Sequence, residues 1–168
     1  MSKKIIIISD FFKQDYVSSN HPVGGAELND DVLFSHLENL GLIKNRIHSN
    51  ELADQEMINF IKTNIDCLFL ISNFANMSPR VSTFLAMNCE YVIYEHDYKF
   101  HKYRNPINYR DFIVPRNEIV NFNFFKNAKK TICLSKLHFD IFKKNLGLEN
   151  LHNTTCSLWS DEDLNFIE

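Results

Sequence analysis

The sequence lacks the features of membrane, secreted and disulfide-stabilised proteins. No apolar run approaches the roughly 20 residues that a membrane-spanning helix needs. The start, Met1-Ser2-Lys3-Lys4, leads into an apolar run without the cleavage site of a signal peptide. The four cysteines are widely spaced and form no C-x-x-C pair; they are Cys67, Cys89, Cys133 and Cys156. We therefore expect a cytoplasmic protein with no membrane span and with free, buried thiols.

An excess of charge of either sign is also absent. The chain has 168 residues, and 18 Lys and Arg against 21 Asp and Glu give a formal net charge of -3. This balance does not favour nucleic acid as a partner, although a local basic patch would still allow it. Hydrophobic residues make up 45% of the chain, and no internal repeat or linker interrupts it. One domain with a substantial core is therefore expected over residues 1–168.

Three familiar ligand motifs are missing as well. The chain has no G-x-G-x-x-G fingerprint, no G-x-x-x-x-G-K-[ST] phosphate loop and no H-x-x-x-H pair. The missing phosphate-loop lysine argues against a nucleotide-hydrolysing domain. We expect no metal and no other cofactor.

What the sequence does contain is a strand, a loop and a helix over residues 5–41. Residues 5–8 are consecutive isoleucines, a pattern typical of a strand that is buried on both faces. A polar loop over 10–23 follows, and Gly24-Gly25 opens a helix that ends near Gly41. The start of a helix offers free backbone N–H groups to an anion, and glycine lets a ligand approach closely. The alternative for the glycine pair is a tight turn that needs a positive φ.

Strand-like and helix-like segments alternate along the rest of the chain. We expect strands at 42–48, 66–72, 90–94, 129–134 and 151–158, and helices at 51–64, 79–88, 115–126 and 136–146, with a last helix starting at 160–164. Such alternation indicates right-handed βαβ crossovers. The expected fold is α/β, a single doubly wound Rossmann-like domain with a mainly parallel sheet of about six strands.

Polar residues follow four of the expected strands. They are Ser9 and Asp10, Ser72 and Asn73, Glu95, His96 and Asp97, and Ser135. The carboxyl ends of parallel strands gather at one edge of a sheet, so these residues should line one cleft together with Gly24 and Gly25.

Within this set, the run Glu95-His96-Asp97 carries the most chemical information. A histidine beside a carboxylate in a cleft can act as a general base or hold a substrate hydroxyl. One alternative is a hydrogen-bonded polar turn. A metal site is a weaker alternative, because three adjacent residues do not easily face one ion.

The predicted loop over 98–114 interleaves cations with aromatic residues. Tyr98, Lys99, Lys102 and Arg104 begin this pattern, which suits phosphates together with the flat rings of sugars or bases. The alternative is an exposed basic lid whose aromatic residues pack on the body of the protein. Five histidines have no evident partner in the sequence and are interpreted as ordinary residues: His21, His36, His48, His138 and His152.

These motifs, taken in order, resemble a known family. The chain is similar to the N-terminal domain of GT-B fold glycosyltransferases, particularly the large retaining group called family four. The resemblance rests on Gly24-Gly25-Ala26-Glu27 at a helix start, on His96-Asp97-Tyr98 after a strand, on the strand and serine of 128–135, and on the segment 151–158. It spans nearly the whole chain.

The resemblance implies a sugar transfer from a nucleotide-sugar donor to an acceptor hydroxyl. It implies that Gly24 and Gly25, with Ser9 and Asp10, lie near the donor diphosphate. His96 would then assist at the reacting centre, and Asp97 would orient His96 or bind acceptor. The remaining candidate contacts, to the acceptor or the loop, are Glu27, Ser72, Asn73, Tyr98, Lys99, Lys102, Arg104 and Ser135.

The chain departs from this family at its end. GT-B enzymes have a second domain that binds the nucleotide-sugar, and this sequence stops at Glu168, about where that domain would begin. We expect a companion chain that supplies the nucleotide-binding domain, a homodimer that rebuilds the cleft, or a segment of a longer protein. The alternative function is a non-catalytic module that binds a nucleotide, a glycan or nucleic acid.

Overall fold

The computed structural model describes residues 3–19, 22–161 and 164–165. Its centre is a six-stranded sheet in which every pairing is parallel, with the strand order β2-β1-β3-β4-β5-β6. The strands are β1 (Ile5–Ser9), β2 (Ile43–His48), β3 (Leu68–Ile71), β4 (Glu90–Glu95), β5 (Lys130–Cys133) and β6 (Leu151–Asn153). The expected α/β Rossmann-like fold is confirmed.

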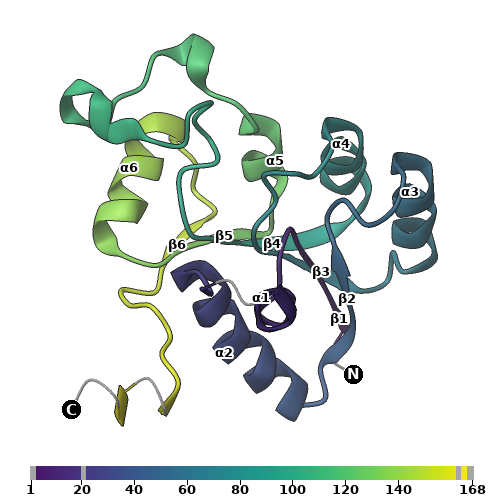
Figure 1. The fold of residues 1–168 in the computed structure, drawn as a ribbon. Helices are drawn as coiled ribbons and strands as arrows, with labels where there is room; N and C mark the ends of the chain where they lie inside the picture. Colours follow the sequence, from purple (N-terminus) through teal and green to yellow (C-terminus); the bar gives the residue numbers. More distant parts are fainter. Residues whose placement is uncertain (1–2, 20–21, 162–163, 166–168) are drawn as a thin grey trace.

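Helices cover both faces of this sheet (Figure 1). The helices α1 (Lys13–Ser19) and α2 (Gly25–Asn39) lie on one face. The other face carries α3 (Asp54–Thr63), α4 (Pro79–Asn88), α5 (Phe122–Asn127) and α6 (Lys136–Leu146). The connection from β1 to β2 therefore runs on one face and the later connections run on the other. The chain adds β2 on one side of β1 and adds β3 to β6 on the other side. The strand order therefore reverses between β1 and β3, the position at which doubly wound sheets bind their ligands.

The isoleucine run of β1 separates two cores, because successive strand residues point to opposite faces. Ile6 and Ile8 belong to the larger core under α3, α4, α5 and α6. Ile5 and Ile7 belong to the smaller core under α1 and α2. All five residues of β1 are buried, as the run predicts for a central strand.

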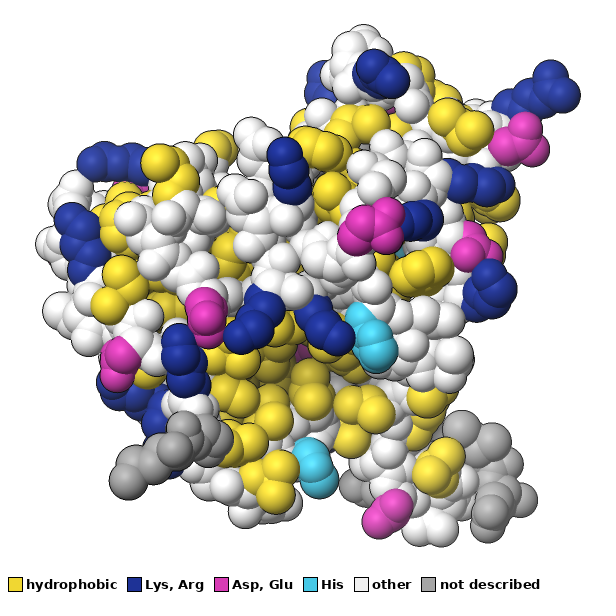
Figure 2. Space-filling model, turned by 180° about the vertical axis from the view of Figure 1, so that it is seen from behind, with side chains coloured by type: hydrophobic (Ala, Val, Ile, Leu, Met, Phe, Trp, Pro, Cys, Tyr) yellow, Lys and Arg dark blue, Asp and Glu magenta, His cyan; other side chains and the backbone are white. Residues whose placement is uncertain are grey.

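The smaller core leaves part of the sheet uncovered. On the well-covered face of β4 and β5, Tyr91, Ile93 and Cys133 are 0% exposed. On the opposite face, Val92 and Ile132 are only half-buried. Figure 2, which views the molecule from behind, shows hydrophobic side chains gathered in a hollow on this side.

Three predicted segments differ from the structure. The expected loop over 10–23 contains helix α1. The expected helix over 115–126 is a 3-10 turn at Arg116–Glu118 followed by the short α5, because Ile119 forms a bridge with His101 and Asn121 is left-handed. The expected strand over 151–158 ends at Asn153.

Two expectations about single residue types also change. Cys67 and Cys133 are buried, but Cys156 is exposed, so the expectation of buried thiols is wrong there. Among the histidines, His48 has Asp15 as a partner at 3.0 Å and His138 binds the Asp97 backbone, whereas His21 lies outside the described residues. None of the helices in the described ranges has the length and apolar character needed to cross a bilayer.

Candidate functional site

The site is built around His96, which follows β4 and is held by a carboxylate from helix α2. His96 Nε2 lies 2.7 Å from Asp30 Oδ1, and both side chains are more than nine-tenths buried. The second oxygen of Asp30 accepts a hydrogen bond from Ser72 Oγ at 2.5 Å. Because a carboxylate accepts, Nε2 carries a proton, and in the neutral ring Nδ1 is then the nitrogen with the lone pair.

Asn29, the neighbour of Asp30, fixes the same helix to β4 and to the chain beyond β6. Its Oδ1 accepts a hydrogen bond from the Tyr94 hydroxyl at 2.5 Å, and its Nδ2 donates to the Leu158 carbonyl at 2.9 Å. Burial, with the nearby charge of Asp30, raises the pKa of Tyr94. The neutral hydroxyl thus stays a donor, and the start of α2 is held at a fixed distance from His96.

A pocket of about 290 Å³ opens beside His96. Gly25 and His96 both line it, so the glycine pair and the histidine meet at one edge of the sheet as expected from the topology. Its other walls are Ala26, Leu28, Asn29, Leu134 and the segment 157–159. Trp159 is 55% exposed and offers a flat aromatic face at the rim.

The start of helix α2, at Gly25 and Ala26, forms one wall of this pocket. The first intrahelical bond runs from Leu28 N to the Gly24 carbonyl, so the N–H groups of Gly25 and Ala26 have no partner within the helix. Neither glycine adopts a positive φ; that of Gly24 is -77°. A tight turn with positive φ is therefore not the reason for the pair.

The two glycines have different surroundings. A Cβ at Gly24 would lie 2.5 Å from Glu27 Oε2, so the buried carboxylate of Glu27 folds back over the helix start. A Cβ at Gly25 would meet nothing within 4 Å. Gly24 makes room for Glu27, whereas Gly25 leaves the pocket open.

Asp97 points away from His96, although the two are adjacent in sequence. Its Oδ1 lies 3.1 Å from Lys99 Nζ, and its Oδ2 lies 3.3 Å from Arg104 Nη1. Burial alone would raise the pKa of Asp97, but Lys99, the contact with Glu95 and Arg104 together lower it. The carboxylate that orients His96 is Asp30 and not Asp97.

Lys99 is buried rather than an exposed loop cation, with 3% of its side chain accessible. Its Nζ also lies 3.1 Å from Glu95 Oε1. Glu95 is fully buried, and burial raises its pKa to about 8 despite the charge of Lys99. Its second oxygen, Oε2, has no hydrogen-bond partner among the described residues.

The remaining predicted residues lie outside the pocket and make contacts that stabilise the neighbouring loops and helices. Ser9 donates to the Phe11 carbonyl at 3.0 Å, and Asp10 accepts from Ser49 Oγ and from Asn76 N. Asn73 accepts from Asp10 N through its carbonyl at 2.6 Å. Tyr98 packs on His138 and Phe142, and Ser135 caps helix α6. None of these residues lines the pocket beside His96.

Sequence reasoning missed Asp30, Asn29 and Trp159. Asp30 lies one helical turn after Glu27 and one turn before the buried Phe34, so helical spacing puts this acid on the inner face of α2. That signal was available in the sequence. Trp159 gave no signal beyond being the only tryptophan, because its position depends on how the chain turns back after β6.

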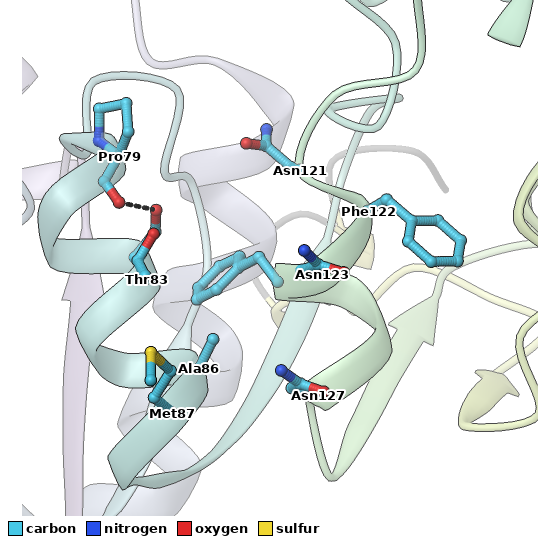
Figure 3. Close-up of a pocket in the computed structure, with 10 residues that line it drawn as sticks. Pro79, Thr83, Ala86, Met87, Asn121, Phe122, Asn123 and Asn127 are labelled. Carbon is cyan, nitrogen blue, oxygen red and sulfur yellow. Dashed lines mark hydrogen bonds between the residues drawn. The ribbon is translucent and has the colours of Figure 1, made fainter.

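Another pocket, of about 410 Å³, lies between α4 and α5 and away from His96. Figure 3 shows Asn121, Asn123 and Asn127 along the α5 side and Met87 on the α4 side. No charged residue lines it. Across the described ranges, no group of three His, Cys, Asp or Glu residues is arranged to hold a metal ion.

No protein-family model matches the chain, and neither curated proteins nor solved structures give a match. The function is therefore argued from the geometry of the site and from the ordered motifs of the sequence.

Proposed function

We propose that this chain is the acceptor-side part of a glycosyltransferase, which moves a sugar from a nucleotide-sugar donor to an acceptor hydroxyl. The observation that carries the proposal is the shared pocket of Gly25 and His96, in which His96 is held by the buried Asp30. The order of the motifs around these residues, described above as a resemblance to GT-B enzymes, supports the same class of reaction.

The chemistry follows from the two sides of the pocket. Nδ1 of His96 would accept the proton of an acceptor hydroxyl as the sugar is transferred, while Asp30 stabilises the charge that forms on the ring. The N–H groups of Gly25 and Ala26, which have no partner within helix α2, would stabilise negative charge on the donor diphosphate. Trp159 would supply a stacking surface for a ring of the donor or acceptor.

This proposal requires a nucleotide-binding domain beside the pocket. A companion chain or a second copy of this chain would close the pocket from the open side. The half-buried apolar side chains on the α2 face of β4 and β5 support a homodimer, because a contiguous apolar surface favours association.

The test is a transfer assay with a panel of nucleotide-sugars and hydroxyl acceptors, together with titration calorimetry of each ligand. We expect His96→Ala to reduce release of the nucleoside diphosphate by about 100-fold or more. Asp30→Asn should reduce it less and should shift the pH profile, because it removes the carboxylate that orients His96.

The matched control is His152→Ala, which removes an exposed histidine from β6. It should leave transfer and binding unchanged. If the wild-type chain binds no nucleotide-sugar and no acceptor, or if His96→Ala transfers sugar at the wild-type rate, the proposal is wrong.

The second candidate is a binding module that has kept the half-fold without catalysis. It is favoured by a second, cation-lined pocket at the same edge of the sheet. Saturable ligand binding that His96→Ala leaves intact, with no turnover of any donor, would favour this candidate over the first.

A further inference from the structure

A second pocket, of about 390 Å³, lies beyond Asp97 at the same edge of the sheet. It is lined by Ala75, Asn76, Lys99, His101, Lys102, Arg104, Val120 and Asn121. The residues around 75 follow β3, and those from 99 to 104 follow β4. His96 and Lys99 are three positions apart, so the two pockets lie on either side of one short turn.

Cations outnumber ionised carboxylates in this second pocket. Lys99 and Arg104 share Asp97, as described above. Lys102 is exposed, and no carboxylate among the described residues lies within ion-pair distance of its Nζ, which sits 5.4 Å from the Tyr103 ring. Lys102 interacts with the carboxylate of Glu118 only at longer range. The pocket therefore holds at least one cation without a direct ion-pair partner among the described residues.

The nearby carboxylates are engaged or neutralised. Glu118 accepts hydrogen bonds from His101 at 3.1 Å and from the Tyr109 hydroxyl. Burial of Glu95 favours its protonated form near neutral pH, so it does not cancel the charge of Lys99 fully. The balance of charge thus favours an anion.

Backbone conformation and one side-chain contact shape the turn that carries these cations. Arg104 adopts a left-handed conformation, with φ of 53°, which a residue other than glycine rarely takes. Asn121 Nδ2 donates to the Lys99 carbonyl at 2.9 Å and closes the pocket from the other side. The guanidinium of Arg104, paired with Asp97 next to the Lys99 ammonium group, matches the oxygens of a phosphate or carboxylate.

We propose that this cation-lined pocket binds an anionic group, a phosphate or a carboxylate, of the molecule that accepts the sugar. Assigning the anion to the acceptor rests on the proposed function, but binding of the anion does not. The position of the pocket, one turn from His96, would hold the charged group while a hydroxyl of the same molecule reaches the histidine.

The test is titration of the whole chain with inorganic phosphate and, separately, with acetate at constant ionic strength, followed by calorimetry and by 31P line broadening for phosphate. We expect saturable binding of at least one anion. The double variant K102A/R104A should weaken it about tenfold or more, since two charge-assisted contacts are removed. Preference for phosphate or for acetate identifies the kind of anion.

The matched control is K130A/K144A, which removes the same charge from two exposed lysines on β5 and α6. It should change the dissociation constant less than twofold. The variant K102R/R104K should restore most of the binding and shows that loss in the alanine variant is not a folding defect. No saturable binding, or equal losses in the two alanine variants, overturns the proposal.

The outcome can be separated from that of the proposed function. His96→Ala should bind the anion as the wild type does, whatever its effect on transfer. If the chain binds the anion but transfers no sugar, the anion does not belong to a sugar acceptor, and the pocket remains an anion-binding site. Sugar transfer that K102A/R104A leaves unchanged removes the pocket from the acceptor site while the proposed function stands.

Discussion

His138 on helix α6 is buried in a place that disfavours its charged form. Its ring packs against Tyr98 and Phe142, with ring centroids 5.0 Å away in each case. Its Nε2 donates to the Asp97 carbonyl at 2.6 Å. Burial lowers the pKa of His138 to about 4, even though the Asp97 carbonyl favours the proton. This histidine therefore helps to place the turn that carries Asp97 and Lys99, and it does so as a neutral ring.

Protonation of His138 predicts a loss of stability in acid. In the unfolded chain its pKa returns to about 6.5. Between pH 6.5 and 4 the unfolded state therefore binds a proton that the folded state does not bind. The contribution of the neutral His138 ring to the free energy of unfolding is fully present above pH 6.5. It is lost as the pH falls toward 4, by about 3 kcal/mol at most. Urea unfolding between pH 4 and 7 measures it.

The variant His138→Gln keeps a donor for the Asp97 carbonyl but has no titrating group. We expect it to be less stable than the wild type at pH 7 and to have a shallower slope of stability against pH. His36→Gln changes an exposed histidine on α2 and should leave the slope as it is. Identical slopes for wild type and His138→Gln would refute the assignment.

At the level of single residues, the sequence identified His96 but not its partner. The position of His96 after a buried strand is a local pattern. Its contact with Asp30 joins residues 66 positions apart and depends on how α2 packs on the sheet. The same limit explains Lys99, which the sequence predicted as a ligand-contacting cation of the loop over 98–114. Only the folded turn brings Glu95 and Asp97 against its ammonium group.

Among the secondary structure elements, the start of α2 has the clearest link to function. Gly24 and Gly25 differ in what a side chain would meet, so their substitutions should separate folding from binding. Gly25 is in the first turn, where alanine is the better helix former by up to about 1 kcal/mol. Its Cβ would meet no neighbour and would extend into the pocket instead.

We predict that Gly25→Ala keeps or slightly raises the melting temperature while it lowers sugar transfer about tenfold or more, because a methyl group would stand at the proposed diphosphate site. Gly24→Ala is the matched comparison. It should lower the melting temperature, because its Cβ displaces the buried Glu27 carboxylate. Thermal unfolding and the transfer assay together measure both. A Gly25→Ala variant with normal transfer would show that the donor diphosphate does not bind beside Gly25.

The elements that the sequence predicted well are those with a local cause. Buried apolar runs gave the strands. The predicted helices over 79–88 and 136–146 match α4 and α6, whose starts are capped by Ser78 and Ser135. The prediction of a helix over 115–126 was wrong, because the conformation of this segment is set by contacts with distant residues, such as the bridge from Ile119 to His101. Helix α1 was missed because its residues carry little helical periodicity and are surrounded by polar loop signals.

At the scale of the whole molecule, the two faces of the sheet are unequally covered. Within the part of the chain that the structure describes, α3, α4, α5 and α6 cover one face, whereas only α1 and α2 cover the other. The α2 side of β4 and β5 therefore keeps half-buried apolar residues. A doubly wound sheet normally hides both faces. A second copy of the chain on this face would complete the cover and would bring another surface near the pocket beside His96.

Sedimentation velocity from about 1 to 100 μM tests this association. We expect the wild-type chain to shift from monomer to dimer as the concentration rises, and Ile132→Glu to remain monomeric, because a carboxylate buried in an apolar interface costs several kcal/mol. Met87→Glu is the control, since Met87 is 76% exposed on the opposite side of the sheet; it should dimerise like the wild type. Circular dichroism must show that Ile132→Glu is folded. A wild-type chain that stays monomeric over the whole range would exclude the homodimer.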